Sequence, residues 1–167
     1  AAKLRNGLPD ARVAARATTF VLVSSEQRSF GTQLVGVEPG YEPGVSSIPG
    51  LLSSGRYLQD SEAAEMVIGS VMARNLKVDI GDELTFLGSG LDGSFAAGVV
   101  TVVGIFDSGS KDIDRSLAEV PLGYFQDSFA MQDNGHSIVI AANELSSVPD
   151  LLGPLNAMIA QQADLVA

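Results

Sequence analysis

Short apolar runs recur along the chain, and polar stretches that contain glycine and proline separate them. Runs of this length that are rich in β-branched and aromatic residues favour strands. The expected strands cover residues 18–26, 32–37, 65–70, 83–87, 99–106 and 136–143.

Helical patterns are confined to shorter segments. An amphipathic helix is expected from Ser70, because apolar residues recur up to Leu76 and a polar residue stands at its start. A second helix is expected after Pro121. A last helix is expected over residues 145–162, and two prolines interrupt its beginning.

Turn residues mark the connections. The sequence EPGYEPG, residues 38–44, predicts a loop, and residues 48–53 predict one helical turn. Residues 108–122 are expected to form a polar loop that returns to a short apolar piece. Strands that are joined partly by hairpins and partly by short helices indicate the α+β class.

Composition narrows the classes of function. The chain has 167 residues, of which 46% are hydrophobic and 18% charged, so it can bury a core. Its net charge of −10 argues against binding to nucleic acid or to anionic lipid, since like charges repel. The absence of cysteine excludes disulfides, thiolate metal sites and cysteine nucleophiles.

The ends of the sequence suggest a piece of a larger protein. The longest apolar run, residues 96–106, is about half the length needed to span a bilayer. The start has no long apolar segment of a signal peptide and no methionine. We therefore expect the parent protein to supply any membrane or targeting segments.

The sequence GSGLDG, residues 88–93, matches the dinucleotide-binding pattern G-x-G-x-x-G. That site requires a strand before the glycines and a helix after them. A strand is expected beforehand, but residues 95–106 are β-branched and strand-like. Glycines between two strands favour a hairpin turn, which is the preferred interpretation.

Other catalytic patterns are incomplete. Ser108 to Lys111 matches S-x-x-K, but the companion motifs of the penicillin-recognising hydrolases are missing. His136 is the single histidine, which makes a catalytic zinc site or a serine triad improbable, and a surface turn is preferred for it. The sequence DIDR, residues 112–115, lacks the glycine and distal glutamate of a calcium loop. We expect no catalytic, cofactor or metal residues.

An ordered series of elements in the middle of the chain resembles the extracytoplasmic domain of MacB/FtsX-type ABC transporter permeases. The resemblance covers residues 34–126, with LVGVEPGYE at its start. Its markers are Gly55-Arg56, Val67-Ile68-Gly69, Ala73, Leu76, Val78, Gly81-Asp82, the stretch 102–106, Asp114 and Pro121-Leu122.

The resemblance implies a two-lobed α+β domain outside the cytoplasmic membrane, between two transmembrane helices. Residues 1–54 and 119–167 would form a porter-like lobe with a mixed sheet and helices. Residues 55–118 would form a smaller, mostly β insert, the Sabre. The implied partners are the transmembrane helices of the same permease, a second permease subunit and a cytoplasmic ABC ATPase. The resemblance also implies a periplasmic adaptor, carrier or substrate protein as a partner. It implies no binding of nucleic acid.

One departure from the family concerns its lipoprotein-releasing LolC/LolE branch, whose longer hairpin grips a carrier. Here the connection is only residues 88–98, so capture of that carrier is doubtful. This hairpin and the loop 109–117 are the expected partner contacts. The candidate residues are Leu91, Asp92, Phe95, Lys111, Asp112 and Asp114. The alternatives are a secreted interaction module and a small ligand-binding enzyme that uses residues 88–93.

Overall fold

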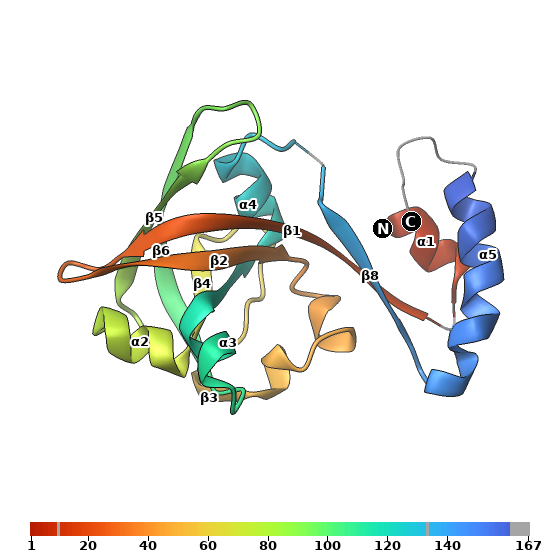
Figure 1. Ribbon diagram of the computed structural model, residues 1–167, viewed down its shortest axis with the longest axis horizontal. Coiled ribbons are helices and arrows are strands. Elements are labelled where there is room, and N and C mark those ends of the chain that lie inside the picture. Colours follow the sequence, from red (N-terminus) through yellow and green to blue (C-terminus); the bar gives the residue numbers. More distant parts are fainter. Residues whose placement is uncertain (10, 133, 161–167) are drawn as a thin grey trace.

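The computed structural model describes residues 1–9, 11–132 and 134–160. Six of its strands form a closed ring in the order β1–β2–β7–β4–β6–β5, because β5 pairs back onto β1 (Figure 1). The strands are β1 (Ala11–Ser24), β2 (Ser29–Val37), β3 (Leu52–Gly55), β4 (Glu65–Gly69), β5 (Glu83–Ser89), β6 (Phe95–Phe106), β7 (Leu117–Pro121) and β8 (Ser137–Ala142). This barrel is mixed, since β2–β7 and β4–β6 are parallel pairs and the others are antiparallel.

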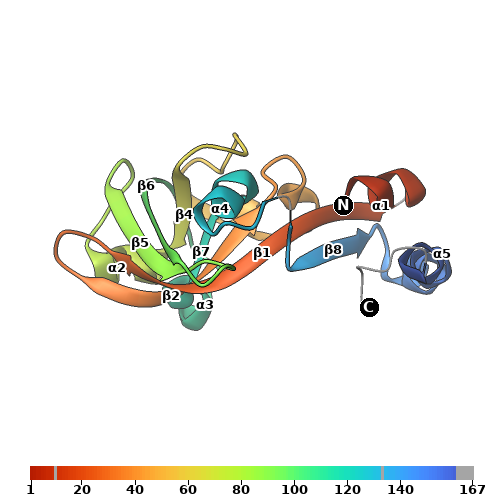
Figure 2. The same cartoon turned by 90° about the horizontal axis from the view of Figure 1, so that it is seen from above.

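Within the described residues, five helices accompany the strands: α1 (Ala2–Gly7), α2 (Ser70–Leu76), α3 (Lys111–Ser116), α4 (Leu122–Ser128) and α5 (Val148–Ala160). Single 3₁₀ turns cover Glu42–Gly44, Ile48–Gly50 and Leu145–Ser147. The mixed sheet with helices confirms the predicted α+β class. Helices α2, α3 and α4 lie around the barrel, whereas α1, α5 and β8 form a separate group beside it (Figures 1 and 2).

The barrel has an apolar interior, because alternate residues of its strands point inward. Phe86 of β5 stacks on Phe129, with ring centroids 5.6 Å apart, and Phe129 lies 4.5 Å from Phe125 of α4. Helix α4 thereby packs aromatic rings onto the core. A second, smaller cluster contains Phe106 and Val37. Ile48 of the second 3₁₀ turn belongs to this cluster, which attaches the loop after β2 to the barrel.

The group formed by α1, β8 and α5 has only a thin core. Leu4, Leu8 and Val13 are its buried residues, and side chains of β8 and α5 pack against them. Strand β1 is shared, since its first half belongs to this group and its second half to the barrel. The predicted lobe boundaries at 54/55 and 118/119 stay a prediction, and strands from both expected lobes are hydrogen-bonded in one sheet.

Three local predictions were wrong or incomplete. The first strand begins at Ala11 and not at residue 18. Its start was missed because residues 11–17 are rich in alanine and arginine, which do not favour strands. Helix α1 at Ala2–Gly7 was not predicted. The stretch expected as a polar loop after residue 108 contains α3 and the barrel strand β7.

Gly69 occupies a position where no side chain fits, and we expect Gly69→Ala to destabilise the fold by about 2–3 kcal/mol. A Cβ there would lie 2.2 Å from the backbone oxygen of Asp114, so backbone must move. Gly50→Ala is the matched control, because a Cβ at Gly50 meets nothing within 4 Å. Urea unfolding of both variants measures the difference, and equal stabilities would contradict this account.

Candidate functional site

Strand β1 changes its hydrogen-bonding partner at Arg16. Residues 11–16 pair with β8, and residues 16–24 pair with β2, so Arg16 opposes both Ser137 and Val37. The two partners lie on opposite edges of β1. One edge is left by β8 after Arg16, and, within the described residues, the other edge has no strand partner before Arg16. We call the surroundings of Arg16 the junction, since the barrel and the α1–β8–α5 group meet there.

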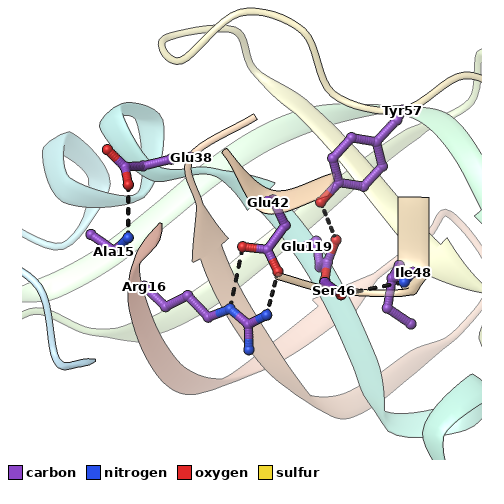
Figure 3. A network of polar contacts seen from close by, with 8 residues as sticks. All are labelled: Ala15, Arg16, Glu38, Glu42, Ser46, Ile48, Tyr57 and Glu119. Atoms are coloured by element: carbon purple, nitrogen blue, oxygen red, sulfur yellow. Dashed lines mark hydrogen bonds and ion pairs between the residues drawn. The ribbon is translucent and has the colours of Figure 1, made fainter. Parts of the chain in front are cut away.

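An ion pair anchors the barrel side of the junction. Arg16 binds Glu42 through two guanidinium nitrogens: Nε donates to Glu42 Oε2 at 3.3 Å, and one terminal nitrogen donates to Oε1 (Figure 3). The Glu42 side chain is completely buried, whereas that of Arg16 is 27% exposed. Glu42 lies at the start of the first 3₁₀ turn, so the pair holds the loop after β2 against β1.

Glu38 covers the edge of β1 where β2 has ended. Its Oε2 accepts a hydrogen bond from the backbone N–H of Ala15 at 2.7 Å (Figure 3). The same oxygen forms an ion pair with Arg5. Arg5 also donates from Nε to the carbonyl of Val13 at 2.9 Å and lies over the ring of Tyr41. These contacts supply the partners that a continuing strand would otherwise provide.

Behind the ion pair lies a second buried carboxylate. The hydroxyl of Tyr57 donates to Glu119 Oε2 at 2.6 Å, and Glu119 is 3% exposed (Figure 3). Burial raises the pKa of Glu119 to about 7; the Tyr57 hydrogen bond opposes this shift and the nearby Glu42 charge adds to it. Burial and the charge of Glu119 raise the pKa of Tyr57.

The arrangement is suited to holding backbone in place. Each carboxylate of the junction is engaged by an arginine, a tyrosine or a backbone N–H. Over residues 1–9, 11–132 and 134–160, no group of three or more histidine, cysteine, aspartate or glutamate residues could hold a metal ion. The network therefore holds the loop after β2 and the free edge of β1 in place.

The glycine-rich run 88–93 forms the tip of the β5–β6 hairpin, which confirms the hairpin prediction. Gly93 has a φ of 80°, and Asp92 Oδ1 accepts hydrogen bonds from the N–H and the hydroxyl of Ser94. Both bonds lower the pKa of Asp92, and the bond from the Ser94 hydroxyl has the larger effect. A strand follows the glycines, so the strand–glycine–helix order of a dinucleotide site is not formed.

Leu91 and Phe95 flank this turn, and both side chains are exposed, Phe95 by 90%. Lys111 and Asp112 are exposed on α3, at a different place on the barrel, so the structure does not bring the two candidate groups together (Figure 1). The contact role of all six candidates stays a prediction.

Asp114 differs from the other five candidate residues. It is 2% exposed, and its Oδ1 accepts hydrogen bonds from the backbone N–H and the hydroxyl of Ser108. The structure therefore gives this carboxylate a local role, which is to fix the turn between β6 and α3. Asp112 instead pairs with Arg115 on the surface of the same helix at 3.0 Å.

None of the junction residues was predicted from the sequence. Glu119 carried one usable signal, since it stands inside the apolar stretch LAEVPL, where a charge is unusual. Arg16, Glu42 and Tyr57 carried none, because they lie in different segments and meet only in the fold. His136, expected in a surface turn, is exposed and accepts a hydrogen bond from the Thr18 N–H at 2.9 Å.

The protein is thus an α+β domain in which one long strand, β1, joins a closed mixed barrel to the α1–β8–α5 group. The profile of the family described as MacB-like periplasmic core domain matches residues 1–156. The chain belongs to this family, and the resemblance inferred from sequence is confirmed. None of the described helices is long and apolar enough to cross a membrane.

Solved structures with the same fold come from transporters. The extracellular domain of the noncanonic ABC-type transporter YknZ from Gram-positive bacteria is 19% identical, with a TM-score of 0.67 over 89% of this chain and 74% of that one. The periplasmic region of MacB from Actinobacillus actinomycetemcomitans is 12% identical, with a TM-score of 0.62 over 89% and 66%. A permease domain from Porphyromonas gingivalis is 19% identical, with a TM-score of 0.53 over 92% and 70%. No curated protein matches the chain.

Proposed function

We propose that the chain is the extracytoplasmic domain of a MacB/FtsX-like ABC transporter permease and that it transmits ATP-driven movement to a substrate or a periplasmic partner. Membership of the MacB-like periplasmic core domain family supports the class of protein. The proposed setting is the outer side of the cytoplasmic membrane, with a second permease subunit and a cytoplasmic ATPase in the complex. We infer no catalytic role.

The observation that carries the proposed transmission is the continuity of β1. One strand of 14 residues runs from the α1–β8–α5 group into the barrel wall without a break. A hydrogen-bonded strand is stiff along its length, so a displacement of one half displaces the other. Rigid coupling of this kind is a common way in which domains pass on a conformational change.

The junction keeps the two halves of β1 in line. Glu38, Arg5 and the Arg16–Glu42 pair hold β1 to the loop after β2. Movement of α1 and α5 would then reach the barrel, and through it the β5–β6 hairpin. Of the candidate contacts, the exposed Leu91, Asp92 and Phe95 lie at that hairpin.

An insertion that interrupts β1 tests the transmission. Two glycines placed between Arg16 and Ala17 fall where pairing passes from β8 to β2, so each ladder can keep its own register. In the full-length permease we expect substrate transport to fall by roughly tenfold or more while ATP hydrolysis continues. The two activities are measured in the same reconstituted preparation.

Two controls separate continuity from stability. The same insertion between the exposed Gln59 and Asp60 leaves β1 intact and should leave transport unchanged. Gly69→Ala lowers stability while β1 remains continuous, and its folded fraction should transport normally. Unchanged transport after the insertion at Arg16 would refute the proposed transmission.

A further inference from the structure

The outer wall of the barrel carries an exposed apolar surface beyond the predicted contacts. Phe20 is 77% exposed and Phe95 90%, although both stand on strands whose alternate residues fill the core. Leu22, Leu87 and Val99 are about half exposed on the same strands. Isolated exposed apolar residues need no explanation, but a contiguous group of them does.

Strand register places these residues side by side. Leu22 pairs with Leu87 across β1 and β5, and Leu87 pairs with Ala97 across β5 and β6. Neighbouring strands lie about 4.8 Å apart, so these side chains form one row. The two phenylalanines occupy one end of the strand segments, and Val99 occupies the other.

The surface is also free of charge. It comprises three outward positions on each of four adjacent strands, and we call it the wall patch: Phe20, Leu22 and Ser24; Ser29, Gly31 and Gln33; Thr85, Leu87 and Ser89; Phe95, Ala97 and Val99. None of these twelve is charged, in a chain with 20 acidic and 10 basic residues. Depletion of charge together with exposed aromatic rings is characteristic of the centre of a protein interface.

Its dimensions are those of an interface core. Four strands and five residues of strand length give roughly 19 by 17 Å, or about 300 Å². A stable interface buries about 800 Å² on each partner, so the surrounding residues must also take part. Those surrounding residues therefore help to decide which partner fits.

The rim of the wall patch is predominantly acidic. Glu26, Asp82 and Glu83 lie at the Val99 end, where they line a hollow together with Lys77. Asp92 lies in the hairpin at the other end, and Arg28 is the second basic residue of the rim. Of the six charged residues named here, four are acidic and two are basic.

We propose that the wall patch binds another protein through an apolar, uncharged segment that is flanked by lysine or arginine. The apolar centre would supply the contact area, and the basic flanks would meet the acidic rim, which favours the correct partner by charge complementarity. A second copy of this chain fits poorly, because its rim is acidic too and its net charge of −10 repels. This assignment is independent of whether β1 transmits movement.

Site-specific photo-cross-linking in cells that express the full-length protein tests the proposal. A photoreactive amino acid replaces Leu87 at the centre of the wall patch, and in a control it replaces Leu51, which is 37% exposed elsewhere on the barrel. Mass spectrometry then identifies the cross-linked peptide. We expect a peptide of another protein, with apolar residues bordered by lysine or arginine, from Leu87 only.

A double variant, Phe20→Ser with Phe95→Ser, should reduce this cross-link by tenfold or more, because exposed aromatic residues at an interface centre contribute strongly to affinity. Both side chains are solvent-exposed, so the melting temperature should change little. Cross-links to a second copy, to lipid or to an acidic segment would overturn the proposal. An equal yield from Leu51, or a cross-link unaffected by the double variant, would overturn it as well.

Discussion

Replacing Arg16 by methionine is expected to lower the free energy of unfolding by about 3 kcal/mol. The substitution keeps most of the side-chain volume but leaves the Glu42 carboxylate without its cation. Glu42 is completely buried, so its charge cannot be solvated by water instead. The partial exposure of Arg16 places the expected loss at the lower end of values for buried pairs. Urea unfolding at neutral pH measures it.

Two further variants identify the cause of this loss of stability. Arg16→Met combined with Glu42→Gln should recover a large part of the stability, because the uncompensated charge is gone. Arg56→Met removes a similar ion pair with Glu65, but Arg56 is 45% exposed, so a loss below about 1 kcal/mol is expected. Equal losses for Arg16→Met and Arg56→Met would show that burial of Glu42 is not the cause.

Replacing Glu119 by glutamine is expected to change how stability depends on pH. The folded pKa of Glu119 is about 7, above its ordinary value of 4.5, so the folded state binds more protons between these values. The contribution of Glu119 to stability is therefore fully present below about pH 4.5 and is lost as pH rises to about 7. Glutamine is neutral at every pH and keeps an acceptor oxygen for Tyr57. From pH 5 to pH 8, the wild type should lose about 2 kcal/mol relative to Glu119→Gln.

The measurement is urea unfolding of both proteins at pH 5, 6, 7 and 8. Glu62→Gln is the control, because Glu62 is exposed and its removal should leave the pH profile parallel to that of the wild type. A Glu119→Gln profile that also runs parallel to the wild type would contradict a carboxylate that takes up its proton on burial. The domain would then tolerate the charged form of Glu119 at the junction.

The pH dependence bears on the proposed transmission. Glu119 and Glu42 lie close enough to influence one another, and Arg16 offsets the charge of both. Loss of the Glu119 proton would add a second negative charge to the interior beside the point where β1 changes partners.

Local sequence determined most elements of the barrel and the β5–β6 hairpin. The strands at 83–87 and 99–106 carry alternating apolar residues, and the glycines of GSGLDG can adopt the backbone of a tight turn. These signals act over a few residues, so they survive without knowledge of the fold. The ordered series from Gly55 to Leu122 likewise sufficed to indicate the family.

Only the tertiary structure decided the first half of β1, the closure of the barrel and the junction. Residues 11–16 prefer a helix by composition, and they are extended because β8 pairs with them from more than 100 positions away. Closure depends on the β1–β5 and β2–β7 pairs, which are distant in sequence too. Arg16, Glu42 and Tyr57 resemble ordinary surface residues in sequence, and only the apolar neighbours of Glu119 hint at its burial. Their meeting at the junction is a consequence of which strands become neighbours. Long-range pairing is set by the burial of the whole core, which no local pattern records.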